Sequence, residues 1–208
     1  MMKIQKLRFR LLVIFFLVVV PVILPRTALS HPHVFVVTRL VSVFDDEGLA
    51  GIRVKWGFDE MFSSMIAGDY DQNHNGKLEK PEIALIKKEA FSYLADHDYF
   101  CFIRIDEKPF KVKYVREFSA FLNEGKLSYE FFIPCHVKSG KAFRKIAMSL
   151  YDPTYYTAVF FAENQPVSIE SGSGFEISST IAKNQETSYY YDMLHPWELI
   201  LNFRLKNE

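Results

Sequence analysis

Residues 71–82 read Asp71-Gln72-Asn73-His74-Asn75-Gly76-Lys77-Leu78-Glu79-Lys80-Pro81-Glu82, a run of oxygen-bearing side chains with one central glycine. The spacing matches the twelve-residue EF-hand loop, in which positions 1, 3, 5, 7, 9 and 12 surround a calcium ion and position 6 is a glycine at a sharp turn. The six ligand positions hold Asp71, Asn73, Asn75, Lys77, Glu79 and Glu82. Lys77 would contribute its backbone carbonyl, and Glu82 would close the shell with both carboxylate oxygens. The sequence therefore predicts a Ca²⁺ site in this loop.

An EF-hand also needs an amphipathic helix on each side of its loop, and the flanking sequence supplies both. Apolar side chains recur there at helical spacing. They are Phe58, Met61, Phe62, Met65 and Ile66 before the loop, and Ile83, Ile86, Ala90, Phe91 and Leu94 after it. Pro81 falls in the first turn of the second helix, where its missing N–H costs little. We expect a helix–loop–helix insertion at about residues 58–96; the alternative is a polar turn between two helices.

The composition of the loop predicts weak calcium binding. Three carboxylates stand beside two neutral asparagines, two lysines lie close by, and the sequence contains no second loop of this kind. We therefore expect a Kd on the order of 10⁻⁴ M or poorer. A lone site of this strength favours a structural role, because about 1 mM calcium would still add roughly 1.4 kcal/mol to the free energy of unfolding.

The sequence on both sides of the insertion alternates between apolar and polar residues, as half-buried strands do. Before the insertion, residues 34–44 and 52–56 flank the turn at residues 45–48 and predict a hairpin. After it, strands are expected at residues 101–106, 110–114, 127–137, 143–150, 157–162, 167–169, 175–180 and 197–205. The pattern predicts the α+β class: a mainly antiparallel, β-sandwich-like single domain over residues 31–208 with an inserted EF-hand helix–loop–helix.

The first thirty residues predict export. Four basic residues precede the apolar run Leu11–Leu24, and Ala28-Leu29-Ser30 places small residues where a signal peptidase cuts. We expect a signal peptide at residues 1–30 and a periplasmic or secreted protein that does not span the membrane after cleavage. An uncleaved anchor is the alternative, but the apolar run of about fourteen residues is shorter than the roughly twenty that a membrane helix needs.

The charge of the expected mature chain excludes some partners. The whole sequence is neutral, with 25 Lys and Arg against 25 Asp and Glu. Residues 1–30 contain five basic and no acidic residues, so residues 31–208 hold 20 basic against 25 acidic residues, a net charge of −5. A mildly acidic domain argues against nucleic acid and anionic lipid as main partners.

Export also affects how the two cysteines are interpreted, because thiols pair in an oxidising compartment. Cys101 and Cys135 each fall on the apolar side of an alternating strand, so both side chains should point into the core. Either they form a disulfide or they remain two buried free thiols. Sequence alone leaves both alternatives open, because it does not show whether the two residues are close.

The expected mature chain begins His31-Pro32-His33, and residues two apart in an extended chain project to the same side. Two imidazoles and the terminal amine could bind one transition metal, in the manner of a histidine brace. Imidazole suits Ni²⁺, Cu²⁺, Zn²⁺ or Co²⁺, so this site would differ chemically from the calcium loop. The alternative is a pair of histidines on an exposed terminus.

The sequence gives little support for an enzyme. It contains no Gly-x-Ser-x-Gly elbow, and the segment Tyr151–Tyr156 is typical of a turn in which Asp152 binds backbone amides. Catalysis would need an open metal site. We therefore expect a protein without enzymatic activity.

Four stretches resemble a known family: His31-Pro32-His33-Val34-Phe35, Trp56-Gly57-Phe58-Asp59-Glu60, Asp98-Tyr99-Phe100 and Tyr151-Asp152-Pro153-Thr154-Tyr155-Tyr156. The chain is similar to exported bacterial proteins of unknown function, often labelled the periplasmic component of an ABC-type transport system, that carry an embedded calcium-type loop. Members are frequently found beside nickel, cobalt or other metal transporters, which implies an accessory role in metal movement. This chain departs from the usual pattern by having asparagine instead of aspartate at positions 73 and 75.

Three hypotheses follow. The first is a periplasmic calcium-binding accessory protein that exchanges a transition metal with a membrane transporter, and the His31-Pro32-His33 terminus motivates it. The second is a calcium-stabilised interaction module without metal traffic. The third is a copper-dependent redox enzyme that uses the histidine brace. Metal content after gentle purification separates the first two, and redox turnover is the test of the third.

Overall fold

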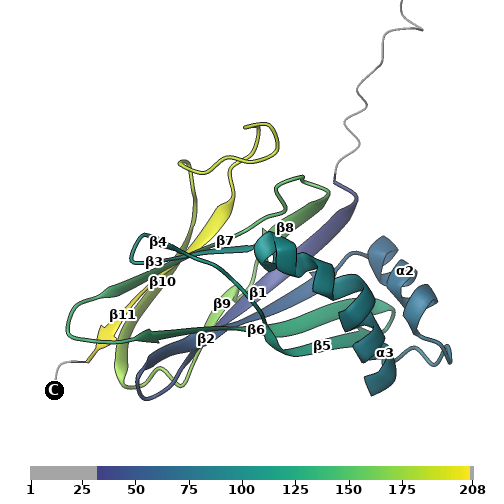
Figure 1. Cartoon of the computed structure of the whole chain (residues 1–208), viewed down its shortest axis with the longest axis horizontal. Helices are drawn as coiled ribbons and strands as arrows, with labels where there is room; N and C mark the ends of the chain where they lie inside the picture. The colour runs from purple at the N-terminus through teal and green to yellow at the C-terminus, as the bar shows by residue number, and fades with distance from the viewer. Residues whose placement is uncertain (1–31, 207–208) are drawn as a thin grey trace, which may run out of the picture. The chain divides into compact units, whose positions relative to one another are not determined.

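The structure, a computed structural model, describes residues 32–206 and consists mainly of β-strands (Figure 1). The strands are β1 (Val34–Phe44), β2 (Gly48–Phe58), β3 (Cys101–Ile105), β4 (Lys108–Phe110), β5 (Arg116–Asn123), β6 (Lys126–Lys138), β7 (Arg144–Leu150), β8 (Thr157–Phe161), β9 (Val167–Glu170), β10 (Phe175–Lys183) and β11 (Trp197–Leu205). Within residues 32–206 the helices all lie between β2 and β3: α2 (Glu60–Tyr70), α3 (Lys80–Ile86), the π-helical η1 (Lys87–Phe91) and the 3₁₀-helical η2 (Ser92–Phe100). The expected signal peptide and His31 lie outside the described residues.

The first sheet has the strand order β5-β6-β2-β1-β8, and β9 also pairs with β1. Strands β1 and β2 form the expected hairpin, and β2, β6 and β5 continue the sheet in antiparallel pairs. Strands β8 and β9 instead run parallel to β1. Alternation predicted β1 correctly because every second residue of β1 is buried from end to end. The same alternation carries no information about the direction of a strand's neighbour, so the parallel pairs were not predicted.

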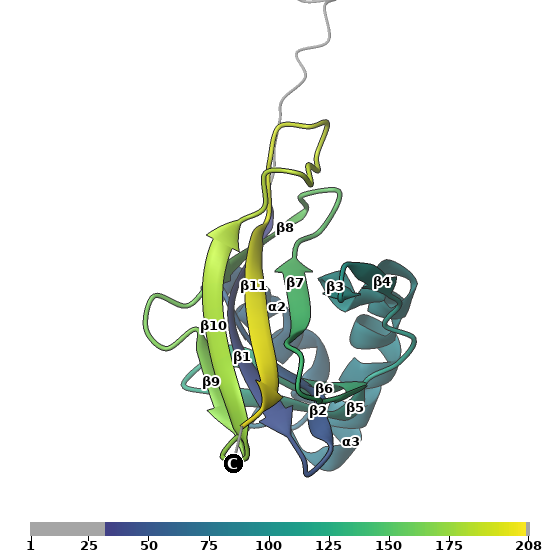
Figure 2. The ribbon, with the colours of Figure 1, turned by 90° about the vertical axis from the view of Figure 1, so that its left-hand side faces the viewer.

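The second sheet has the order β10-β11-β7-β3-β4, and every neighbouring pair in it is antiparallel. Figure 2 shows β10, β11 and β7 side by side, with the final strand β11 in the middle of the three. The two antiparallel-rich sheets confirm the mainly β architecture expected from the sequence.

Both sheets and the helical insertion contribute to one hydrophobic core. Its most deeply buried side chains come from all three parts of the chain. They are Leu40, Ile52, Phe131 and Ile133 from the first sheet, Ile146, Met148, Leu199 and Phe203 from the second, and Ile86 and Phe91 from the insertion. The insertion therefore belongs to the core of the domain.

The ends of the insertion are fixed by backbone chemistry. Asp59 precedes α2 and accepts hydrogen bonds from Phe62 N at 2.9 Å and from Phe35 N at 2.7 Å, which caps the helix and joins it to β1. At the other end, Asp98, Tyr99 and Phe100 all have left-handed backbones, with φ of 52°, 53° and 54°. A left-handed run cannot continue a right-handed helix. The insertion thus spans residues 60–100, four residues further than expected at its end.

Two of the sequence predictions need correction. The strand expected at residues 110–114 is observed as the short β4, Lys108–Phe110, and β5, Arg116–Asn123, was missed. Strand β5 lies at the edge of its sheet and buries only Ala120 and Leu122 fully, so its apolar alternation is weak. Within residues 32–206, no helix is long and apolar enough to cross a membrane.

Candidate functional site

The two acidic residues at the ends of the loop are buried and bind its backbone. Asp71 follows α2 and is 5% exposed, and Glu82 lies in α3 and is 6% exposed. The Asp71 carboxylate accepts from Gly76 N at 2.9 Å and from Asn75 N at 3.2 Å. The Glu82 carboxylate accepts from Gln72 N at 2.9 Å and from Glu79 N at 2.8 Å. Asp71 therefore holds the middle of the loop, and Glu82 holds residues near its two ends.

Asn73, Asn75 and Glu79 are exposed, and their side chains bind one another. The Glu79 carboxylate accepts from the Asn75 amide at 2.5 Å and from the Asn73 amide at 3.3 Å. The amide oxygens of Asn73 and Asn75 accept from Asn75 N at 3.0 Å and Lys77 N at 2.8 Å. Hydrogen bonding with Glu82 and with the Asn75 amide lowers the pKa of Glu79, so its anionic form is favoured.

The turn at the middle of the loop has the conformation that the motif requires. Gly76 has φ of +76°, a left-handed backbone that glycine adopts without penalty. His74 also has a positive φ of 55° and is exposed, in agreement with its place outside the ligand positions. Hydrogen bonds thus join positions 1 and 5, positions 9 and 12, and position 9 with positions 3 and 5 of the motif.

The oxygen donors of the loop suit a hard cation. Carboxylate, amide and carbonyl oxygens are the ligands that Ca²⁺ prefers, and the side-chain set here contains two buried carboxylates, one exposed carboxylate and two amides. Among residues 32–206 no group of three or more His, Cys, Asp or Glu side chains is arranged as a metal site. The three carboxylates of the loop, Asp71, Glu79 and Glu82, are therefore not grouped as a metal site in this structure.

The helices beside the loop are anchored in the domain. The Ser63 hydroxyl of α2 is buried, donates to Asp59 O at 2.6 Å and accepts from Leu127 N of β6 at 3.0 Å. On the exit side, the Phe91 ring lies 5.1 Å from the Phe131 ring, centroid to centroid. Movement of either helix end would therefore be transmitted to the core.

The residues expected to bind a transition metal are only partly described. His31 lies outside the described residues. His33 is half-buried just before β1, its N donates to Tyr156 O at 2.9 Å, and its ring centroid lies 4.9 Å from that of Tyr156. The transition-metal site therefore stays a prediction.

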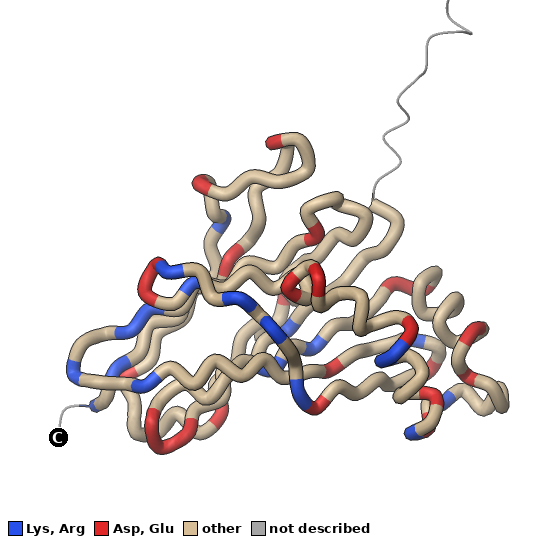
Figure 3. The backbone as a smooth tube through the Cα atoms, in the orientation of Figure 1, with Lys and Arg blue, Asp and Glu red and all other residues tan. Residues whose placement is uncertain are grey.

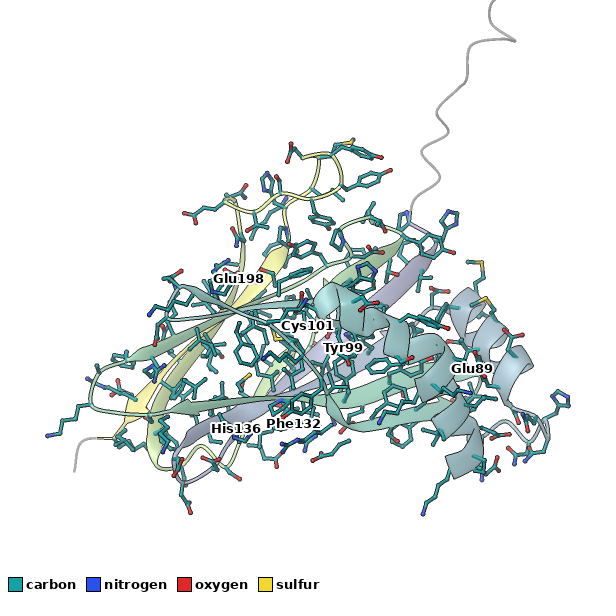
Figure 4. All side chains as sticks on the ribbon, in the orientation of Figure 1. Glu89, Tyr99, Cys101, Phe132, His136 and Glu198 are labelled. Atoms are coloured by element: carbon teal, nitrogen blue, oxygen red, sulfur yellow. The ribbon has the colours of Figure 1, made fainter. Side chains whose placement is uncertain are left out.

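Cys101 and Cys135 are both buried, as strand parity predicted, and both are free thiols in the structure. Cys101 belongs to β3 of the second sheet and lies in the interior (Figure 4), whereas Cys135 belongs to β6 of the first sheet. Burial raises the pKa of both thiols, to about 12 for Cys135 and well above its usual value for Cys101. The Cys135 Sγ donates to Ile133 O at 3.7 Å. The structure thus shows the second of the two alternatives, buried thiols, and not the disulfide.

The stretches that carry the family resemblance have clear local roles. Asp59 caps α2, and the Asp98 carboxylate accepts from Val112 N at 3.0 Å and from Lys111 Nζ at 2.9 Å, which holds the left-handed turn at the end of η2. The Asp152 carboxylate accepts from Thr154 N, Thr154 Oγ1 and Thr157 N at 2.8, 2.7 and 3.0 Å. The turn expected at Tyr151–Tyr156, with Asp152 bonding backbone amides, is confirmed.

One buried acidic residue was missed from the sequence. Glu198 of β11 is 6% exposed and binds Arg104 Nη2 through both carboxylate oxygens at 3.0 and 3.1 Å (Figure 4). Ser149 Oγ and Asn184 Nδ2 also donate to it, at 2.8 and 3.2 Å. Alternation placed Glu198 on the polar face of its strand, and only the tertiary structure shows that face to be covered.

Comparison with known proteins places the chain among uncharacterised proteins. It is 29% identical over 128 residues to an uncharacterised 15.5 kDa protein in the trpE 3′ region of Spirochaeta aurantia, an alignment covering 62% of this chain and 91% of that protein. It is 26% identical over 142 residues to an uncharacterised protein of Haemophilus influenzae, covering 67% of this chain and 66% of that protein. Neither name mentions calcium or transport. Residues 15–195 match the family described as protein of unknown function (DUF1007), and the chain belongs to that family.

Proposed function

We propose that the chain is a non-enzymatic, extracytoplasmic calcium-binding accessory protein of a transition-metal transport system. In this proposal residues 60–100 form an EF-hand-type insertion in a β-sandwich-like domain, and the loop at residues 71–82 binds Ca²⁺. The observation that carries the calcium site is the pair of buried carboxylates, Asp71 and Glu82, which enclose one loop from its two ends.

The energetics of those carboxylates support a cation. A buried carboxylate costs free energy unless hydrogen bonds or a cation compensate for its lost hydration. In the structure backbone N–H groups supply part of that compensation at Asp71 and Glu82. The proposed ligands are Asp71, Asn73, Asn75, Glu79 and Glu82 with the carbonyl of Lys77. Bound Ca²⁺ would supply positive charge that joins the end of α2 to the start of α3.

The role of such a site is mechanical. Helix α2 ends at Tyr70 and α3 begins at Lys80, so the loop alone determines how the two helices are connected. Both helices pack on the core through residues such as Ile66 and Ile86. A cation that stiffens the loop therefore stabilises the whole insertion.

The transport part of the proposal has a separate basis. It rests on the resemblance to proteins found beside metal transporters and on the His31-Pro32-His33 terminus, which would present imidazoles once export removes residues 1–30. Lys, Arg, Asp and Glu are interspersed along the described chain (Figure 3), a charge distribution that favours a protein partner over nucleic acid. A membrane metal transporter is the proposed partner, and a periplasmic or secreted location follows from the predicted signal peptide.

Thermal unfolding in defined metal ions tests the calcium site. The melting temperature is measured in EGTA, in 1 mM MgCl₂ and in 1 mM CaCl₂ for the wild type, Glu79→Gln and Glu89→Gln. Glu79 is an exposed ligand, whereas Glu89 is an exposed glutamate of η1 outside the loop and serves as the matched control (Figure 4). Calcium should raise the wild-type melting temperature by about 3–6 °C, for a Kd on the order of 10⁻⁴ M.

The pattern across variants is decisive. Glu79→Gln should lose most of the calcium-induced rise and Glu89→Gln should keep it. The same rise in all three proteins, or no rise in the wild type, would refute the calcium site. A calcium response in a protein that retains no transition metal after gentle purification would support the calcium-stabilised interaction module over the transport accessory.

A further inference from the structure

A pocket of about 280 Å³ lies on the side of the second sheet that ends in β4. Its lining comes from β3, β4 and β7, from residues that closely follow β4 and β7, and from Asp98 and Thr187. The volume is just below the range of about 300–1,000 Å³ that holds drug-sized ligands, so the pocket suits a smaller molecule. Both charged and aromatic side chains line it, which favours an amphipathic ligand.

The two cationic residues of the lining are accessible. The side chains of Arg104 and Lys111 are 31% and 59% exposed. Arg104 uses Nη2 to bind Glu198, and within residues 32–206 its Nη1 makes no hydrogen bond. That atom is not one of the buried unpaired polar atoms of these residues, and neither is the Tyr151 hydroxyl, which also makes no hydrogen bond with them. Arg104 Nη1 and the Tyr151 hydroxyl are therefore two donors that solvent reaches.

A buried carboxylate fixes the orientation of the Arg104 guanidinium. Glu198 accepts from Arg104 Nη2 through both of its oxygens, and Ser149 Oγ and Asn184 Nδ2 hold the same carboxylate. Arg104 Nε also lies 3.8 Å from Oε2 of the exposed Glu107. A planar guanidinium that is anchored in this way presents its remaining N–H groups in fixed directions, and carboxylate oxygens match their spacing.

Aromatic rings form the apolar part of the lining. The rings of Phe102 and Tyr151 stack with their centroids 4.3 Å apart, and Phe110 of β4 lies opposite Ile103 of β3. Such rings pack well against a flat apolar group. Burial raises the pKa of Tyr151 more than the nearby charge of Arg104 lowers it, so the hydroxyl stays protonated and can donate at neutral pH. Flat apolar walls and accessible donors thus occur in one small pocket.

The charges around the pocket favour an anion. Residues 108–116 contain four exposed basic residues and no acidic one: Lys108, Lys111, Lys113 and Arg116. Blue recurs along this connection between β4 and β5 in Figure 3. Among the lining residues Asp98 is the only acid, and it already pairs with Lys111 at 2.9 Å. Glu107 pairs with Lys145 at 2.7 Å. The nearby carboxylates are therefore compensated, and the exposed basic residues would attract a small anion.

We propose that this pocket binds a small organic monocarboxylate with a flat apolar body. The carboxylate accepts hydrogen bonds from Arg104 and from the Tyr151 hydroxyl, Lys111 adds positive charge, and the apolar body packs against Phe102 and Phe110. Glu198 is a positioning residue that holds Arg104. The site shares no residue with the loop at residues 71–82, so its ligand binds whether or not that loop holds calcium.

Benzoate and benzamide are matched probes, because they have nearly the same shape and only benzoate is charged. Each is titrated into ¹⁵N-labelled protein in low-salt Tris buffer without calcium, so that no ion in the loop attracts benzoate. The backbone amide resonances of Phe102 and Arg104 report binding, and that of Gly76 in the loop is the internal control. Benzoate should shift the resonances of Phe102 and Arg104 saturably, leave that of Gly76 unchanged, and bind about tenfold more tightly than benzamide, the value of one charge-assisted hydrogen bond.

Variants at accessible positions locate the site. Tyr151→Phe keeps the ring, removes the hydroxyl and should weaken benzoate binding about fivefold. Lys111→Gln should weaken it more than Lys113→Gln, which removes the same charge from an exposed residue of the same segment outside the lining. Arg104 stays in place in every variant, because it neutralises the buried Glu198.

The melting temperature shows that each variant is folded, and the Tyr151 and Lys111 variants are independent tests if one of them fails to fold. Equal affinity for benzoate and benzamide would overturn the proposal, as would unmoved Phe102 and Arg104 resonances. An equal loss in the two lysine variants would mean that benzoate is attracted only by surface charge. Unchanged benzoate affinity in folded Tyr151→Phe would also refute the assignment.

Discussion

Replacing Asn73 and Asn75 together by aspartate should strengthen calcium binding and weaken the calcium-free protein. Both residues are exposed and occupy proposed ligand positions. Their amide nitrogens donate to the Glu79 carboxylate at 3.3 and 2.5 Å, so aspartates there would set carboxylates against a carboxylate. Without calcium, two hydrogen bonds are lost and like charges repel. With calcium, the charge of the ligand set rises and the same carboxylates attract the ion.

The expected size of the effect follows from mass action. With a Kd on the order of 10⁻⁴ M, 1 mM calcium raises the free energy of unfolding of the wild type by about 1.4 kcal/mol, and a tenfold tighter variant gains about 2.7 kcal/mol. In a domain of this size each 1 kcal/mol shifts the melting temperature by about 2–4 °C. The calcium-induced rise should therefore grow from about 3–6 °C to about 5–11 °C, while the melting temperature in EGTA falls below that of the wild type.

Scanning fluorimetry at pH 8, in EGTA and in 1 mM CaCl₂, measures both changes. The matched control is Gln72→Glu with His74→Asp, which adds two acidic side chains to the same loop outside the ligand positions. Aspartate tolerates the left-handed backbone of His74, whose φ is 55°. An equal gain in control and ligand variant would mean that the loop attracts calcium only through its net charge, and the EF-hand reasoning would be wrong.

Three other expectations follow from the structure and the sequence. Cys101 and Cys135 should resist thiol reagents in the folded protein and yield two thiols in denaturant, because burial raises the pKa of Cys135 to about 12 and that of Cys101 well above its usual value. Since folding favours the neutral thiols, the free energy of unfolding should decline as pH rises above about 9. Non-reduced denatured protein without thiols would establish the disulfide instead. Ni²⁺, Cu²⁺ or Zn²⁺ should bind the correctly processed protein more tightly than they bind a His33→Ala variant or a chain with one residue added before His31, and acid should weaken binding because protons compete with the metal for imidazole nitrogens. Equal affinities in isothermal titration would remove that site. A hydrogen bond from Lys145 N and the neighbouring Arg144 lower the pKa of Asp106. Asp106→Asn should therefore destabilise the protein at pH 7, by at most about 1 kcal/mol because the side chain is partly exposed, and the difference from wild type should vanish in acid as Asp106 becomes protonated. A difference in urea midpoint that persists at pH 2 would contradict this account.

Sequence patterns located most strands because buried and exposed residues alternate along these strands. Strand β1 alternates over eleven residues, and β11 keeps Leu199, Leu201 and Phe203 on the buried side. The turn at Asp45 and Gly48 was equally readable, since the Asp45 carboxylate binds Glu47 N and Gly48 N within the turn itself. Features that depend on residues adjacent in sequence were therefore predictable.

Features that depend on distant partners were not. Glu198 reads as an exposed strand residue until Arg104, Ser149 and Asn184 close around it. Asp59 reads as part of a helix start, yet half of its role is to accept from Phe35 N, 24 residues earlier. Trp56 and Tyr129 look like ordinary core aromatics in the sequence, and their unpaired polar atoms become apparent only in three dimensions.

The helical insertion physically connects the proposed calcium loop to an apolar pocket between the helices and the first sheet. Phe62 lines the apolar pocket from α2, the helix that ends at Tyr70, and Ala90 lines it from η1, the helical segment that follows α3. If calcium binding orders these helices, a molecule that binds in the pocket does not have to supply that ordering free energy itself. Coupling between two sites is reciprocal, so the bound molecule would favour calcium binding by the same amount. The helices on either side of the proposed calcium loop also form one wall of the pocket, and the β-sheet forms the other. We therefore expect that calcium bound to the proposed loop would stabilise the helical wall of the pocket.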